Sequence, residues 1–247
     1  LGGKIPFTTS YATFSPGRNW EQIRTTICYN DVPVKIIGSH AGISVGPDGA
    51  THQALEDIAI MRALPNMVVI SPTDSIEAKK ATLAIAKLPK PCYLRLSRDK
   101  VPVITTGETP FEIGKAQVYF AGKDVTVIAT GQMVYRALLA AKQLEKHKIS
   151  VRVINCHTIK PLDRDAILKA AQDTGAIVTA EEHQVTGGLG GAVAELISQY
   201  YPVPLKIIGI EDRFGESGKP DELLEKFGLT KEVIIKAVTA IIRMKER

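Results

Sequence analysis

Short apolar runs rich in β-branched residues alternate along this chain with longer segments in which apolar residues recur at helical spacing. In the first part of the chain, such runs cover residues 34–38, 67–71 and 92–96. Thr51 and Asp74 stand where they can cap helices that end before Pro65 and Pro89. This alternation predicts β-α-β units and a mainly parallel sheet, since parallel strands need helical crossovers.

A second alternating set follows a polar stretch, residues 97–110, that is rich in Pro, Gly and Thr and is interpreted as an interdomain linker. Strands are expected at residues 116–120, 125–129, 151–155, 176–180 and 205–209. Helices are expected at residues 135–146, 163–171, 191–200 and 231–244. The chain has 247 residues, which suits two domains at about 100–200 residues each. We therefore predict two three-layer α/β/α domains with mainly parallel sheets, covering residues 1–110 and 111–247.

Composition excludes several functional classes. No apolar run approaches the roughly 20 residues that a membrane helix needs, so no membrane association is expected. The net charge is +5, but the basic residues are scattered without interleaved aromatics, which argues against nucleic-acid binding. Cys28, Cys92 and Cys156 lie far apart in apolar segments. They are expected to be buried free thiols of a cytoplasmic protein, because disulfides are rare in reducing compartments.

The segment 39–53 is the strongest candidate for a functional site. It follows a predicted strand and leads into the predicted helix capped by Thr51, so it should lie at the carboxyl edge of the sheet, where ligands bind. It carries His40, Asp48 and His52 among several glycines, and His52 is expected in the first helical turn. Any one histidine could simply be solvated, but the three groups together favour a site. The two histidines have no recognisable zinc spacing.

Motifs along the whole chain resemble transketolase. The matching stretches are 6–14, 40–53, 96–98, 158–163, 181–183, 187–191 and 214–220, all in the order found in that family. The part that matches is the C-terminal portion, comprising the pyrimidine-binding domain without its start and then the C-terminal domain. The resemblance implies ketol transfer between sugar phosphates with thiamine diphosphate, and a homo-oligomer that is expected to be a dimer.

The resemblance also implies roles for particular residues. Phe14 and Tyr11 fall where an aromatic wall packs against the cofactor's pyrimidine ring. His52 falls near the cofactor's amino group and the reacting sugar carbons. Asp48 falls where a carboxylate holds a ketose hydroxyl. The predicted catalytic residues are His52, Asp48 and His40.

Substrate binding is implied for three residues, of which Asp48 is one. His40 and Arg98 fall where the sugar phosphate is bound, a task suited to the planar guanidinium fork. Without the resemblance, Arg98 would be interpreted as a surface ion-pair residue. The glycines between Gly187 and Gly191 are interpreted as close packing at a helix start. Residues 181–183 are interpreted as structural or as part of a subunit interface.

Two features that the family needs are not found in this sequence. No glutamate precedes Phe14, although the family uses one to bind the pyrimidine ring nitrogen. The Gly-Asp-Gly motif with a downstream asparagine, which holds the diphosphate and magnesium, is also missing. The resemblance therefore implies that an N-terminal transketolase portion or subunit holds the diphosphate and Mg, and that these 247 residues alone are inactive and bind thiamine diphosphate poorly.

Three other interpretations remain open. Within thiamine chemistry, 1-deoxyxylulose 5-phosphate synthase and the 2-oxo-acid dehydrogenase beta subunit share the two-domain plan. His40 argues against both of them, because the synthase tends to carry a different residue pair there and the dehydrogenases bind no sugar phosphate. The third is a non-catalytic subunit derived from transketolase. The joint presence of His40, Asp48, His52 and Arg98 argues against it.

Overall fold

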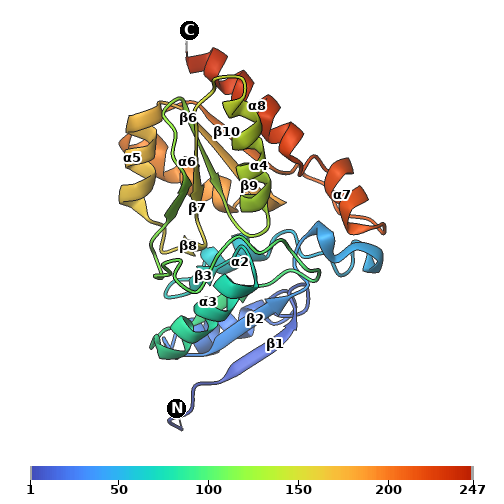
Figure 1. The fold of residues 1–247 in the computed structure, drawn as a ribbon. Coiled ribbons are helices and arrows are strands. Elements are labelled where there is room, and N and C mark those ends of the chain that lie inside the picture. The colour runs from blue at the N-terminus through green and yellow to red at the C-terminus, as the bar shows by residue number, and fades with distance from the viewer. Residues whose placement is uncertain (1, 246–247) are drawn as a thin grey trace.

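The computed structural model describes residues 2–245, which form two five-stranded sheets with helices packed on them. In Figure 1 the N-terminal half of the chain forms the lower body, and the C-terminal half forms the upper body. No helix within residues 2–245 has the length and apolar character needed to cross a bilayer. The predicted fold class, two α/β units with mainly parallel sheets, is confirmed.

The lower sheet has the strand order β1-β2-β4-β3-β8. Its strands are β1 Phe7–Tyr11, β2 Lys35–Ser39, β3 Val68–Ile70, β4 Cys92–Arg95 and β8 Thr158–Lys160. The first four are parallel to their neighbours, whereas β8 pairs antiparallel with β3. Because β8 comes from the second half of the chain, the lower sheet is built from both halves (Figure 1).

The upper sheet has the order β10-β9-β6-β7-β5 and is parallel except for the edge strand β5. Its strands are β5 Gln117–Phe120, β6 Val125–Ala129, β7 Val151–Asn155, β9 Ile177–Gln184 and β10 Leu205–Ile210. Helices α4 Met133–Glu145 and α8 Lys231–Lys245 cover one face. Helices α5 Arg164–Thr174 and α6 Leu189–Tyr200 cover the other face (Figure 1).

The remaining helical elements are short, apart from α3. They are α1 Trp20–Gln22, the π-helix η1 Ile23–Cys28, the 3-10 segment η2 Ile43–Asp48, α2 Asp57–Arg62, α3 Ser75–Lys87 and α7 Pro220–Lys226. Helix α3 begins as predicted, because the Asp74 side chain accepts a hydrogen bond from the Glu77 backbone N–H. Residues 97–110 form no helix or strand.

Most predicted elements are found within a few residues of their expected bounds, and one helix start was wrong. Thr51 does not cap a helix, since α2 begins at Asp57 and the Thr51 hydroxyl contacts the His52 ring instead. His52 therefore lies in a turn and not in a first helical turn. Three further elements, β1, β8 and α7, were not predicted from the sequence. The first has polar alternate positions, and the other two are very short.

An apolar cluster joins the two halves. It contains Ile36, Met61 and Tyr93 from the lower body together with Ile128 and Leu189 from the upper body, all at most 1% exposed. Burial of side chains of this size is the main force that holds such bodies together. All three cysteines are buried and free, as predicted.

A buried carboxyl group also lies between the halves. Glu77 on α3 accepts hydrogen bonds from the Thr73 backbone N–H at 2.7 Å and from the Asn155 side chain at 2.7 Å. Burial raises the pKa of Glu77 to about 7, even though these hydrogen bonds favour the ionised form. An unfolded glutamate titrates near 4.3, so folded Glu77 retains its proton over a pH range in which the unfolded chain has lost it.

We expect the substitution Glu77→Gln to change how stability depends on pH. In the wild type, the Glu77 contribution to the free energy of unfolding is present below about pH 4.3 and is lost as pH rises to about 7. The amide has no proton to lose, so the free energy of unfolding of the variant should rise relative to that of the wild type between about pH 4.3 and pH 7. Above about pH 7 the difference between the two proteins should stay constant. Urea unfolding at several pH values measures this difference. Glu145→Gln, at an exposed position, is the charge-matched control. A constant difference for Glu77→Gln would contradict the expectation.

Candidate active site

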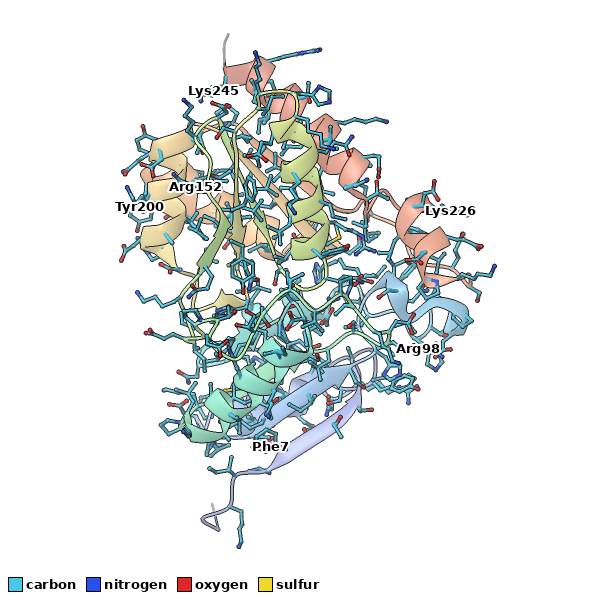
Figure 2. The ribbon with its side chains drawn as sticks, viewed as in Figure 1. Phe7, Arg98, Arg152, Tyr200, Lys226 and Lys245 are labelled. Carbon is cyan, nitrogen blue, oxygen red and sulfur yellow. The ribbon has the colours of Figure 1, made fainter. Side chains whose placement is uncertain are left out.

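The candidate residues meet at the carboxyl edge of the lower sheet. Strands β1, β2 and β4 are parallel neighbours, and Tyr11 at the end of β1 pairs in register with Ser39 at the end of β2. His40 follows β2 directly, and Arg98 lies three residues beyond the end of β4. Figure 2 shows Arg98 on the side of the molecule where the η2 segment lies close to α7. The parallel arrangement thus brings distant parts of the sequence together, as expected for such an edge.

Four rings form an aromatic cluster at this edge. Tyr11 stacks on His40 with ring centroids 4.0 Å apart and planes 11° from parallel. Phe14 lies nearly parallel to Tyr11 at 6.0 Å. His52 stands edge-on to Phe14 at 5.2 Å, with the ring planes at 78°. All four rings are partly exposed, so a flat ligand can reach part of this cluster.

The position of His40 is fixed by both its backbone and its ring. Its φ of 53° lies in the left-handed region, which non-glycine residues rarely adopt and which is often found at functional sites. Its Nδ1 lies 3.2 Å from the Ser39 hydroxyl. Burial, and then the Arg98 charge, lower the pKa of His40 and outweigh the effect of the nearby Asp48. The imidazole is therefore neutral near pH 7 and can both donate and accept a hydrogen bond.

Arg98 and Asp48 form an ion pair beside this cluster. The guanidinium Nη1 donates to Asp48 Oδ1 at 2.9 Å and to the Val45 carbonyl at 2.7 Å. Both side chains are about one-third exposed, at 33% and 28%. Within the described chain, the Nε and Nη2 groups of Arg98 make no further hydrogen bond. The guanidinium therefore keeps donors available for an anion while its position is fixed.

The structure brings together all six residues that the sequence analysis selected. Tyr11, Phe14, His40 and His52 form the aromatic cluster, and Asp48 with Arg98 lies close enough to act on the His40 charge. His52 has its Nδ1 2.9 Å from the Thr51 hydroxyl. Among residues 2–245, no group of three or more His, Cys, Asp or Glu side chains is placed to hold a metal ion.

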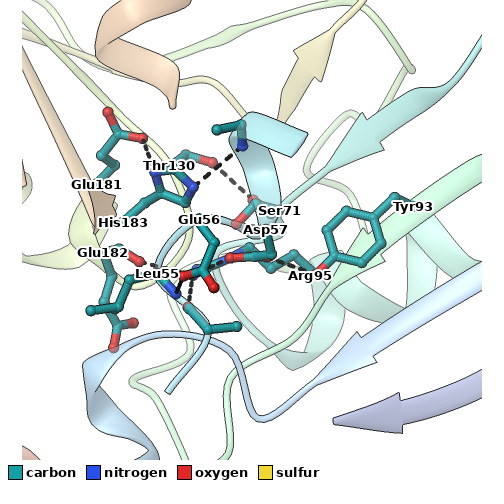
Figure 3. Close-up of polar contacts among 12 residues, drawn as sticks. Leu55, Glu56, Asp57, Ser71, Tyr93, Arg95, Thr130, Glu181, Glu182 and His183 are labelled. Carbon is teal, nitrogen blue, oxygen red and sulfur yellow. Dashed lines mark hydrogen bonds and ion pairs between the residues drawn. The ribbon is translucent and has the colours of Figure 1, made fainter. Parts of the chain in front are cut away.

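Behind the site lies a buried ionic network that the sequence analysis did not identify (Figure 3). Arg95 at the end of β4 donates to the Asp57 carboxylate at 2.8 Å and to the Glu182 backbone carbonyl at 2.8 Å. The Tyr93 hydroxyl donates to the same carboxylate at 2.7 Å. Burial would raise the pKa of Asp57, but the Arg95 charge together with the hydrogen bonds from Arg95 and Tyr93 and the nearby His183 outweighs burial, so the pKa is lowered. Asp57 therefore stays ionised although it is 1% exposed.

Residues 181–183 are buried within the chain. Glu181 accepts hydrogen bonds from the Leu189 and Gly190 backbone N–H groups, at 2.6 and 2.7 Å, at the start of α6. A Cβ at Gly188 would lie only 2.0 Å from Glu181 Oε2, which confirms close packing at this helix start. Burial lowers the pKa of His183 to about 4, so its ring is neutral at pH 7. These contacts support the structural interpretation of the Glu-Glu-His sequence.

Gln53, like the residues of the Arg95–Asp57 network, was not identified as a site residue from the sequence. Its side-chain amide is buried and shares its two N–H donors among three backbone carbonyls, including that of Glu216 from the second half. Gln53 ended the segment 39–53, but an uncharged amide gives no chemical signal in a sequence. Its place next to the predicted site residue His52 was the available indication.

We expect the substitution Arg98→Gln to raise the pKa of His40. It removes the cation that disfavours the imidazolium, and it leaves the Asp48 carboxylate unpaired nearby. NMR titration of the ring proton measures this pKa directly, since the chain has only five histidines. Arg243→Gln, on α8 in the upper body, is the charge-matched control and should leave the His40 titration unchanged. An unchanged or lowered pKa in Arg98→Gln would disprove the electrostatic coupling.

Comparison with known sequences matches each half of the chain to a known domain family. Residues 1–103 match the transketolase pyrimidine-binding domain family, and residues 114–234 match the transketolase C-terminal domain family. A protein of Methanocaldococcus jannaschii, described as a transketolase C-terminal section, is 48% identical over 239 residues, which cover 96% of this chain and 75% of the relative. Human transketolase is 37% identical over 241 residues, but these cover only 38% of its length.

A solved structure supports the same assignment. It is described as a split-gene transketolase in an inactive β4 tetramer, and it matches with a TM-score of 0.93 and 46% identity. The match covers 98% of this chain and 78% of that one. The chain therefore belongs to the transketolase family, of which it comprises the pyrimidine-binding domain and the C-terminal domain.

Proposed function

We propose that this chain is the C-terminal subunit of a transketolase, which transfers a two-carbon ketol unit from a ketose phosphate to an aldose phosphate with thiamine diphosphate. The observation that carries the proposal is the convergence of the Tyr11 and Phe14 rings, two imidazoles and an Arg98–Asp48 pair at a single sheet edge. Family membership alone does not support ketol transfer by this chain, because a subunit without catalytic groups could have the same fold.

The aromatic cluster fits the proposed cofactor. Tyr11 and Phe14 lie within 7° of parallel and are partly exposed, so they can pack against a flat heteroaromatic ring. His52 stands edge-on beside Phe14, where its ring nitrogens can bond to polar groups on such a ring. The chemistry that thiamine diphosphate supplies when bound is a stabilised carbanion for breaking and forming the carbon–carbon bond.

We assign proton transfer and hydroxyl binding to the loop after β2. The His52 Nδ1 contacts the Thr51 hydroxyl, which leaves Nε2 to move a proton to or from a sugar hydroxyl. Asp48 keeps one carboxylate oxygen outside its bond to Arg98, and that oxygen can accept a hydrogen bond from a ketose hydroxyl. Held in place by its ion pair, this carboxylate needs little reorganisation when the substrate arrives.

We assign phosphate binding to Arg98 and His40. The free Nε and Nη2 groups of Arg98 offer the paired donors that phosphate oxygens accept well. A neutral His40 adds one N–H donor without bringing a second full charge close to Arg98. The substrate would thus extend from the aromatic face, where it reacts, to the Arg98 side, where its phosphate binds.

We further propose that an N-terminal subunit holds the diphosphate and its Mg. This proposal is consistent with the described residues 2–245, in which no group of three or more His, Cys, Asp or Glu side chains is placed to hold a metal ion. The relative described as an inactive β4 tetramer of a split-gene transketolase supports a chain that assembles without acting alone. We also propose that the working enzyme is an oligomer with a dimeric core, in the cytoplasm.

The first test is turnover of xylulose 5-phosphate with ribose 5-phosphate. The chain alone, supplied with thiamine diphosphate and Mg²⁺, should show no activity above background. Activity should appear when an N-terminal transketolase subunit is added and should saturate with its concentration. Pyruvate with glyceraldehyde 3-phosphate, the substrates of the deoxyxylulose alternative, should give no product. Activity above background from the chain alone, or none from the assembled enzyme, would refute the proposal.

The second test is the substitution His52→Ala in the assembled enzyme. Loss of a general acid–base group should lower kcat by about 10²–10⁴-fold. His147→Ala, which removes an exposed histidine just after α4, is the matched control and should leave kcat unchanged. Equal turnover of wild type and His52→Ala would instead favour the non-catalytic subunit.

A further inference from the structure

The loop that carries Asp48 and His52 has little regular structure of its own. This substrate loop runs from Gly42 to His52, and its 3-10 segment is interrupted at Gly46, where φ is 80°. Gly42 and Gly49, with φ of 92° and 75°, also lie in the left-handed region that glycine adopts easily. Because glycine-rich backbone has many conformations open to it, this one must be held by contacts from outside the loop.

The first contact is the Gln53 amide. Its Nε2 donates to the Ile43 and Gly46 carbonyls, both at 3.2 Å, and so joins the two ends of the loop. The same nitrogen donates to the Glu216 carbonyl at 2.9 Å, which belongs to the segment before α7. The fit is close, because a Cβ at Gly215 would lie 1.8 Å from Gln53 Oε1.

The second contact is the Glu182 carboxylate at the end of β9. Its Oε1 accepts a hydrogen bond from the Ser44 backbone N–H at 2.6 Å, and its Oε2 accepts one from the Gln132 amide. Gln132 also donates to the Ser44 hydroxyl at 3.0 Å, and Arg136 donates to the Gln132 oxygen at 3.0 Å. The whole group is buried except for part of Arg136.

Close packing against the segment that leads into α7 also holds the loop in place. A Cβ at Gly46 would lie 3.1 Å from the Pro220 ring, and a Cβ at Gly49 would lie 2.6 Å from the Ser217 hydroxyl. The side of the loop that bears Asp48 is held by Arg98, which belongs to the lower body. The contacts from Glu182, Gln132, Glu216, Ser217 and Pro220 all come from residues beyond 130, which belong to the upper body.

We propose that Gln53 and Glu182 are positioning residues, through which the C-terminal half holds the substrate loop so that Asp48 and His52 face the ketose. This inference rests on the proposed function for the roles of those two residues. It assigns the C-terminal half a part in catalysis at a distance from the reacting atoms. Small displacements of catalytic groups are costly, since a shift of about 1 Å can reduce the rate by about 10²-fold.

The first experiment uses Gln53→Met, which keeps the side-chain length but removes the donors. In the assembled enzyme, kcat/KM for the ketose phosphate should fall by about 10²-fold, with KM raised as well as kcat lowered. A purely structural defect would reduce the amount of folded enzyme, and hence apparent kcat, and leave KM unchanged. Gln184→Met is the matched control, because Gln184 also donates to a carbonyl, that of Arg213, but does not contact the loop with its side chain.

Hydrogen–deuterium exchange of the chain itself gives a readout that does not need activity. Amides of residues 43–52 should exchange faster in Gln53→Met than in wild type, while the Gln184→Met chain should match wild type. If the wild-type assembly has no transketolase activity but this exchange difference appears, the proposed function fails while the loop support stands. If wild type is active and Gln53→Met retains its kcat, KM and exchange, the inference is wrong.

The second experiment exchanges two side chains. Glu182→Gln alone places two amide N–H donors face to face, and Gln132→Glu alone places two carboxylates there. Each single variant should raise KM, whereas the double variant restores one donor and one acceptor and should recover most of the wild-type KM. The introduced amide oxygen can still accept from the Ser44 N–H. Additive effects of the two changes would overturn the role of Glu182.

Discussion

The arrangement of the two bodies depends on the contacts that the Arg95 guanidinium makes with Asp57 and Glu182. It is 6% exposed, and a buried charge of this kind is tolerated only with an ionised partner and satisfied donors. Asp57 supplies the counter-charge from the lower body, and the Glu182 carbonyl accepts a further hydrogen bond from the upper body. Removing one member of a buried pair typically costs about 3–5 kcal/mol, because the other charge is left uncompensated. Because these hydrogen bonds are directional, they fix how the two bodies are oriented at their junction as well as where they meet.

The site is built outward from this junction. Glu182 contributes its backbone to Arg95 and its side chain to Ser44, so one residue connects the ionic network to the substrate loop. The parallel order of β1, β2 and β4 then places Tyr11, His40 and Arg98 at a common edge. The aromatic cluster and the ion pair are thus held from below by the sheet and from above by the C-terminal half.

Much of this fold could be predicted from local signals. Strands such as β6 and β7 are rich in Val and Ile, and Asp74 gives a clear cap, so these elements needed no tertiary information. The candidate site residues were found because imidazole, carboxylate and guanidinium groups have recognisable chemistry. Their grouping at one edge followed from the parallel sheet.

The rest depends on contacts that no local pattern contains. The turn at His52 forms because the loop packs on the upper body, whereas the sequence around Thr51 is compatible with a helix start. Gln53 and Arg95 are polar residues whose partners lie far away in the chain, so their burial could not be foreseen. Strand β8 is only three residues long, and it becomes a strand because the edge of β3 is available to it.

Strand β8 has a consequence for how this protein can be divided. It pairs with Val69 and Ile70 of β3, and its Lys160 ammonium donates to the Arg62 carbonyl at 2.9 Å. A polypeptide cut in the loop at residues 97–110 would leave that edge of β3 open, with apolar side chains and free backbone groups facing water. Such an isolated fragment would be prone to aggregate, so the two bodies are folding partners and not separable modules.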